Sequence, residues 1–97
     1  DGATPLLMAS QEGHADCVQL LLGAFAAVDL ARPEDGATSL IMASQQGHAE
    51  CARLLLGAGA TVDLASHAGD TPLFMASQTG HSECVQLLLS GGAHVDR

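Results

Sequence analysis

The residues with the clearest chemical potential are three pairs of histidine and cysteine at one fixed spacing. Each pair follows the pattern His-x-x-Cys with an acidic residue directly before the cysteine: His14 with Cys17, His48 with Cys51, and His81 with Cys84. Zinc deaminases also place a Glu two residues after a ligand His, but their P-C-x-x-C segment is absent here. Zinc needs four ligands at about 2.0–2.3 Å, and each pair supplies two. We therefore expect no metal site. We interpret each His as fastening a turn between helices through ring hydrogen bonds, and each Cys as filling a small gap in the core.

Other candidate catalytic residues are also periodic. Ser10, Ser44 and Ser77 occur at one equivalent position with Gln beside them, and Met8, Met42 and Met75 form a similar series. Because an active site is a single place, we interpret the serines as small residues at helix contacts. We interpret the methionines as core, with an adaptable binding surface as the alternative. The adjacent acids Glu34 and Asp35 look solvated, and the glycines form no phosphate-binding loop. We predict that the chain is not an enzyme and uses no cofactor.

The histidines, serines and methionines belong to one segment, Met-Ala-Ser-Gln-x-Gly-His, that appears three times. The histidines that end it are separated by 34 and then 33 residues. A period near 33 indicates a stacked helical array. We predict a single all-α domain spanning residues 1–97, with repeats at approximately 1–34, 35–68 and 69–97.

Each repeat carries signals for two short helices. Thr4 and Pro5 form a typical helix start, since the hydroxyl can accept from a free backbone N–H and Pro fits the first helical position. Gly13 can end that helix in the left-handed conformation, and a second helix should begin just after His14. Helices of eight or nine residues are too short to be stable alone in water, so we expect them to exist only because they stack.

The three copies resemble the ankyrin repeat. They contain G-A-T-P-L-L-M-A-S-Q-E-G-H, G-A-T-S-L-I-M-A-S-Q-Q-G-H and G-D-T-P-L-F-M-A-S-Q-T-G-H, each followed by a helix ending in L-L-L. The resemblance implies a solenoid of stacked helix-turn-helix units with projecting finger loops, here residues 28–36 and 62–69, beside a concave face. It also implies a role in protein–protein interaction. The usual His of T-P-L-H is replaced by Leu7, Ile41 and Phe74.

Composition limits the class of partner. The net charge is −8, with three Arg and no Lys, which argues against nucleic-acid binding because such binding neutralises phosphates with basic side chains. No apolar run is long enough to cross a membrane. Equivalent cysteines in a stack lie about 8–10 Å apart, too far for a disulfide. We expect reduced thiols, an intracellular protein in the cytoplasm or nucleus, and a protein or peptide partner with basic character.

The resemblance places the partner-binding surface on the fingers and the loop-side ends of the first helices. Residues there differ most between repeats, and they carry more acid than the outer helices. The predicted contact residues are Asp1, Ala3, Gln11, Glu12, Arg32, Glu34, Asp35, Ala37, Gln45, Gln46, Ser66, His67, Asp70, Gln78 and Thr79. The alternative is a structural spacer, a segment of a longer solenoid with no partner of its own.

Two further expectations concern the ends of the array and one aromatic residue. No polar substitutions cap the apolar positions of the first and last repeats, so we expect a segment of a longer array, or ends that associate with one another. Phe25 stands where the other repeats have Gly59 and Gly92. We expect Phe25 to compensate for a strained backbone by packing.

Overall fold

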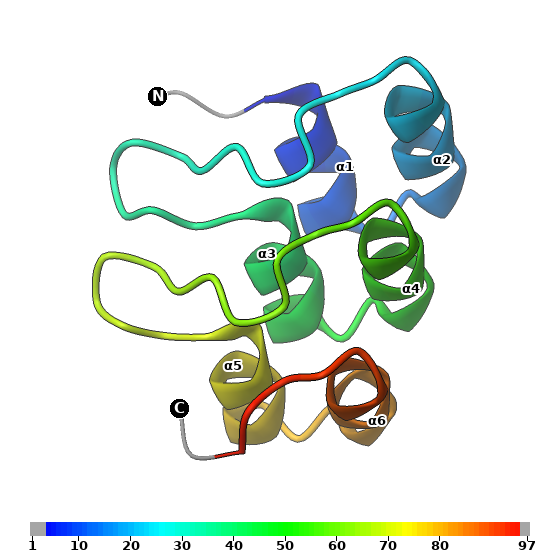
Figure 1. The fold of residues 1–97 in the computed structure, drawn as a ribbon. Helices are drawn as coiled ribbons and strands as arrows, with labels where there is room; N and C mark the ends of the chain where they lie inside the picture. Colours follow the sequence, from blue (N-terminus) through cyan, green and yellow to red (C-terminus); the bar gives the residue numbers. More distant parts are fainter. Residues whose placement is uncertain (1–3, 96–97) are drawn as a thin grey trace.

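The computed structural model describes residues 4–95, and within that range every regular element is a helix. The helices form three pairs: α1 (Pro5–Glu12) with α2 (Ala15–Gly23), α3 (Ser39–Gln46) with α4 (Ala49–Gly57), and α5 (Pro72–Gln78) with α6 (Ser82–Ser90). Helices α1, α3 and α5 stack as an inner layer, and α2, α4 and α6 form an outer layer (Figure 1). The two long loops project from the same side of the stack. The prediction of an all-α solenoid is confirmed.

The inner helices begin as the sequence predicts. The Leu7 N–H donates to Thr4 Oγ1 (3.1 Å), and Thr38 and Thr71 accept in the same way from residues three positions further on. Ser39 takes the place of Pro in α3 without loss of this cap. Gly13 and Gly47 end α1 and α3 with φ of 80° and 76°, the left-handed region that a side chain disfavours.

The core is a continuous stripe of leucine, valine, alanine and cysteine that runs through all three pairs. Leu55 of α4 is completely buried, and Val18 of α2 and Leu88 of α6 are buried to the same degree. Ser10 and Ser44 are also fully buried, as expected for small residues at helix contacts. The Ser10 hydroxyl donates to the Leu6 carbonyl (2.8 Å). Equivalent residues therefore play equivalent packing roles wherever a neighbouring repeat is present.

The joints between repeats use the histidines differently from our expectation. His48 Nε2 lies 3.1 Å from the carbonyl oxygen of Gln11, which belongs to the preceding repeat. Because a carbonyl only accepts, Nε2 carries the proton and donates. A β-carbon placed on Gly13 would lie 2.6 Å from the His48 ring, and one placed on Gly47 would lie 2.5 Å from the His81 ring. Each of these two rings thus packs over the glycine of the repeat before it, and the His48 ring bonds to that repeat instead of to its own turn.

Carboxylates reinforce the same joints. Asp29 accepts from the Thr61 N–H (2.9 Å) and the Thr61 hydroxyl (2.6 Å), 32 residues away. Asp63 accepts from the His94 N–H at 3.3 Å. The Asp that follows the second helix of one repeat therefore hydrogen-bonds to the loop that follows the second helix of the next repeat.

Four expectations about burial are wrong, and the first concerns Ser77, which is exposed although Ser10 and Ser44 are buried. Cys17 is exposed, whereas Cys51 and Cys84 are buried, because no repeat precedes α2 in the structure. Met8 is 45% exposed for the same reason, although Met42 is only 5% exposed. Phe25 does not pack: it is 94% exposed and has a φ of 65°.

Candidate binding groove

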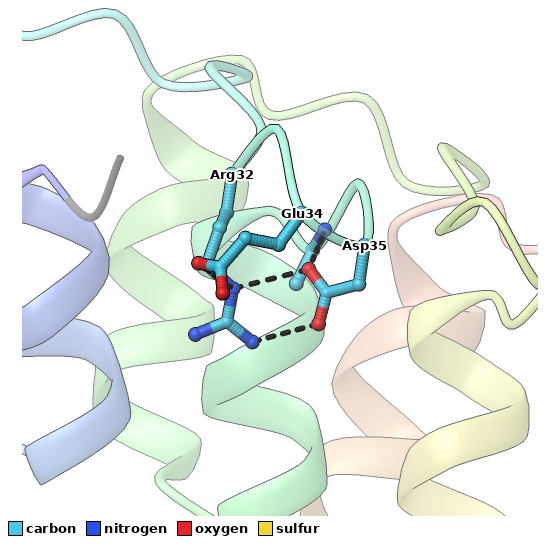
Figure 2. A network of polar contacts seen from close by, with 4 residues as sticks. Arg32, Glu34 and Asp35 are labelled. Carbon is cyan, nitrogen blue, oxygen red and sulfur yellow. Dashed lines mark hydrogen bonds and ion pairs between the residues drawn. The ribbon is translucent and has the colours of Figure 1, made fainter. Parts of the chain in front are cut away.

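The first finger loop, residues 28–36, is closed by a guanidinium and a carboxylate. Arg32 Nε donates to Asp35 Oδ1 (3.0 Å) and Arg32 Nη2 to Asp35 Oδ2 (2.8 Å), so the pair is bidentate (Figure 2). Asp35 Oδ1 also accepts from the Ala37 N–H at 3.0 Å. Backbone bonds between Arg32 and Ala37 (2.9 Å) and between Gly36 and Arg32 (2.7 Å) complete the hairpin-like turn.

This geometry determines the charge state of the finger. The hydrogen bonds from Arg32, and then the one from the Ala37 N–H, lower the pKa of Asp35 from 3.8 to about 2. The same pair raises the pKa of Arg32. Glu34 is less closely held, with Oε1 4.0 Å from Arg32 Nε and more than half of its side chain exposed. At neutral pH Asp35 is therefore ionised and engaged in the fold, while Glu34 faces solvent.

The second finger loop, residues 62–69, lies against the first. The His67 N–H donates to the Asp35 carbonyl (2.8 Å), and the Ser66 N–H donates to the Asp70 carbonyl (3.0 Å). Gly36 has a φ of 75°, and a β-carbon there would lie 2.5 Å from the His67 ring. Only glycine fits at this contact, which fixes the two fingers side by side.

A groove of about 570 Å³ runs between the fingers and the inner helices. Its inner wall is formed by Ile41, Met42 and Met75, which belong to a small apolar cluster with Leu7 and Ala37. The sequence-predicted contact residues that line it are Gln11, Arg32, Glu34, Asp35, Ala37, Gln45, Gln46, Ser66, His67 and Asp70. The structure thus brings ten of the fifteen predicted residues to one concave surface.

The remaining five predicted residues do not line the groove. Asp1 and Ala3 fall outside the described residues. Glu12 lies beside Met8 and Cys17 on the exposed surface at the first repeat. Gln78 and Thr79 are exposed at the end of α5, where the Thr79 hydroxyl donates to the Met75 carbonyl (2.7 Å).

The predicted contact residues did not include the apolar wall formed by Ile41, Met42 and Met75. Ile41 and Met42 are only 3% and 5% exposed, so they satisfy the interpretation as core and still present an edge to the groove. The available signal was the replacement of the usual polar residue by Ile41, which makes this surface more apolar.

The excess of acid expected on the concave side is absent from the groove lining. Glu34, Asp35 and Asp70 stand against Arg32 there, and the outer helices carry three acids, Asp16, Glu50 and Glu83, against Arg53. Both surfaces therefore have a net charge of −2. The expected difference in net charge between the two surfaces disappears because Glu12 does not line the groove and Asp1 lies outside the described residues. Glu34 and Asp70 remain as groove acids, and Asp70 forms no ion pair with residues 4–95.

Comparison with known proteins identifies this architecture. A family model described as ankyrin repeats, in three copies, matches residues 6–97. This chain belongs to the ankyrin repeat family. Ankyrin repeats are generally non-enzymatic modules of protein–protein interaction.

The crystal structure of the human ASB11 ankyrin repeat domain is similar to this one, with a TM-score of 0.91 and 35% sequence identity. The match covers 95% of this chain and 41% of that one, so the chain spans less than half of that domain's length. No curated protein sequence matches the chain.

Residues 4–95 lack the features of two other classes of site. No cluster of three His, Cys, Asp or Glu side chains in residues 4–95 has a geometry that could hold a metal ion. None of the helices in the same range is long and apolar enough to span a membrane.

Proposed function

We propose that this chain binds a protein or peptide segment in the groove between the two fingers and the inner helices, and that it has no catalytic activity of its own. The observation that carries the proposal is the convergence of ten mostly polar residues from two fingers and two inner helices around an apolar wall; several of them, such as Gln46 and Asp70, differ between repeats. A position that varies between repeats is not needed to maintain the repeated fold, so its residue is available for recognition.

The groove favours an occupant of mixed character. Met42 and Met75 are flexible and can adapt to the shape of an apolar side chain. Glu34 and Asp70 lie on the polar rim, where a Lys or Arg of the partner could approach them. We therefore propose a segment with an apolar side chain next to a basic one. The acids act mainly on association rate and selectivity, since rim charges contribute less to affinity.

The cysteines support an intracellular setting. All three are free thiols in the structure, and unpaired buried cysteines are typical of reducing compartments. The cytoplasm or nucleus is the proposed location.

The test begins with a defined ligand. Random peptides displayed on phage are selected against the immobilised chain, and a binding peptide is synthesised. Glu34→Lys should weaken its binding on the order of fivefold, about 1 kcal/mol for one reversed charge pair near the surface, with less effect in 1 M salt. Glu83→Lys on α6 is the matched control, because Glu83 is an exposed acid on the outer layer.

Glu34→Lys is preferable to a change at Asp35, which would also break the bonds to Arg32 and Ala37. The proposal is wrong if selected peptides are weakened by Glu83→Lys and not by Glu34→Lys. Failure of repeated selections to yield any groove-dependent peptide would favour the structural spacer instead.

A further inference from the structure

The four charged side chains of the groove are not equally available to a partner. Arg32 is the only Arg or Lys among the described residues that line the groove. Its guanidinium donates to both carboxylate oxygens of Asp35, at 3.0 and 2.8 Å (Figure 2), and only 23% of its side chain is exposed. The two charges compensate each other within the first finger. An acidic segment would therefore meet no free cation in the groove.

The other two carboxylates are open. Glu34 approaches Arg32 only to 4.0 Å, and 58% of the Glu34 side chain is exposed. The carboxylate of Asp70 forms no ion pair with residues 4–95, and the hydrogen bonds of Asp70 with Ser66 use its backbone N–H and carbonyl. Glu34 and Asp70 are therefore the charges with which a bound segment can pair.

These two open carboxylates belong to successive repeats. Glu34 lies in the first finger, which leads into α3, and Asp70 directly precedes Thr71, the N-cap residue of α5. Helices α3 and α5 pack against each other, and packed helices lie about 8–10 Å apart. The two negative charges are thus displaced along the stack by about one repeat.

The uncharged lining of the groove recurs with the same step. Met42 on α3 and Met75 on α5 occupy equivalent positions, and so do Gln11 on α1 and Gln45 on α3. Thioether side chains adapt to an apolar group, and each glutamine amide offers a donor and an acceptor to the backbone of a bound segment. The groove therefore presents similar contacts at each step along the stack.

A segment in the polyproline II conformation matches this step. It has three residues per turn and rises about 3.1 Å per residue, so side chains three positions apart lie on one side, about 9.3 Å from each other. The residues between them are turned away by about 120°. A β-strand directs residues three positions apart to opposite faces, and an α-helix advances only about 4.5 Å in three residues.

We propose that the preferred occupant of the groove is an extended segment with two Lys or Arg residues three positions apart and an apolar residue between them, an inference that rests on the proposed function. The segment lies along the stack in the polyproline II conformation. One basic side chain pairs with Glu34 and the other with Asp70. The apolar side chain between them is turned toward Met42 and Met75. Acidic segments are rejected, because both open charges of the groove are negative.

The test compares three synthetic peptides by fluorescence anisotropy. The reference is G-P-K-P-L-K-P-G, with lysines three positions apart. The isomer G-P-P-K-L-K-P-G has the same composition but lysines two positions apart, and G-P-E-P-L-E-P-G replaces both lysines by Glu. The reference should bind about fivefold more tightly than the isomer, because only one surface ion pair, with a free energy of about 1 kcal/mol, forms at the shorter spacing. The acidic peptide should not bind.

Neutral variants of the chain identify the two ion pairs. Glu34→Gln and Asp70→Asn should each weaken the reference peptide about fivefold, and the double variant about 25-fold, because separate contacts are additive. Glu83→Gln on the outer layer is the matched control and should change nothing. Replacing one lysine of the reference by Gln should abolish the effect of one of the two groove variants and leave the other. Circular dichroism verifies that each variant is folded.

The outcomes separate this inference from the proposed function. Equal binding of the two isomers, no binding of the reference, or an affinity unaffected by Asp70→Asn would overturn the inference. Peptides selected from a random library that depend on Glu34 but carry no pair of basic residues three positions apart would also overturn it and leave the proposed function intact. If no groove-dependent peptide emerges at all, both are wrong.

Discussion

Phe25 has a left-handed backbone conformation and a side chain that contacts almost nothing. Its φ is 65°, and the glycines at the equivalent positions, Gly59 and Gly92, have φ of 93° and 97°. The sequence predicted the strain correctly, because glycine at two of three equivalent positions indicates a positive φ. The sequence could not predict that the Phe25 side chain is exposed, because this depends on which elements lie nearby. At the equivalent positions, nothing lies within 4 Å of a β-carbon placed on Gly59 or Gly92.

Phe25→Gly should therefore stabilise the chain. Relief of a left-handed side chain gains about 1–2 kcal/mol, and the flexibility of glycine in the unfolded chain removes about 0.5–1 kcal/mol of that gain. A net gain of about 1 kcal/mol corresponds to a melting temperature higher by about 4–8 °C in a chain of this size. Thermal unfolding measures it, and Gly59→Phe, the reverse change one repeat later, should be destabilising. A clear loss of stability in Phe25→Gly would show that the ring packs against the fold.

The three equivalent cysteines should differ in reactivity. Burial, with a smaller effect of the neighbouring Glu, raises the pKa of Cys51 and of Cys84. In dilute native protein at neutral pH, a thiol reagent should modify Cys17 rapidly and the other two only on unfolding, because the thiolate is the reactive form. Cys17→Ser should remove the fast phase. If two or three thiols of the folded wild type reacted rapidly, the burial of Cys51 and Cys84 between repeats would be contradicted.

At the scale of elements, the starts of the inner helices were predictable and the contacts between repeats were not. Each helix start depends on a Thr hydroxyl and an N–H three residues away, so the signal is contained in adjacent residues. The bond from His48 to Gln11 joins residues 37 positions apart, and no local pattern encodes it. The Arg32 and Asp35 pair lay within reach of sequence reasoning, since one Arg precedes two acids in a short loop. Treating those acids as solvated overlooked it.

The Asp35 carboxylate should stabilise the first finger across most of the pH range. Its pKa is lowered in the folded chain, so its contribution is fully present above the unfolded value of 3.8 and is lost as pH falls through about 2. The carboxyl carbon of Asp35, followed by NMR, should titrate near 2. Arg32→Gln should move that midpoint toward 3.8, because the largest cause of the shift is removed. A wild-type midpoint near 3.8 would show that the bidentate pair does not persist in solution.

At the scale of the whole molecule, repetition made the architecture predictable, and the ends of the array produced the main errors. Met8, Cys17 and Ser77, which were expected to be buried and are exposed, all lie in the first or the third repeat, whereas Phe25 is exposed at a position that no other element covers. A repeat pattern describes an average repeat, whereas burial depends on what lies on either side. The groove lining was predicted largely through family resemblance. Its apolar wall became clear only from the three-dimensional structure, because Met42 belongs both to the core and to the groove lining.

The central claim is that recognition takes place in the groove between the fingers and the inner helices. The most direct measurement is an NMR map of backbone amides while a selected peptide is added to the isotope-labelled chain. Shifts should concentrate at Ala37, Gln45, Gln46, Ser66 and His67, and the outer-layer residues Gln19, Arg53 and Gln86 should stay unchanged. Shifts confined to the outer helices, with the groove amides unmoved, would contradict the claim.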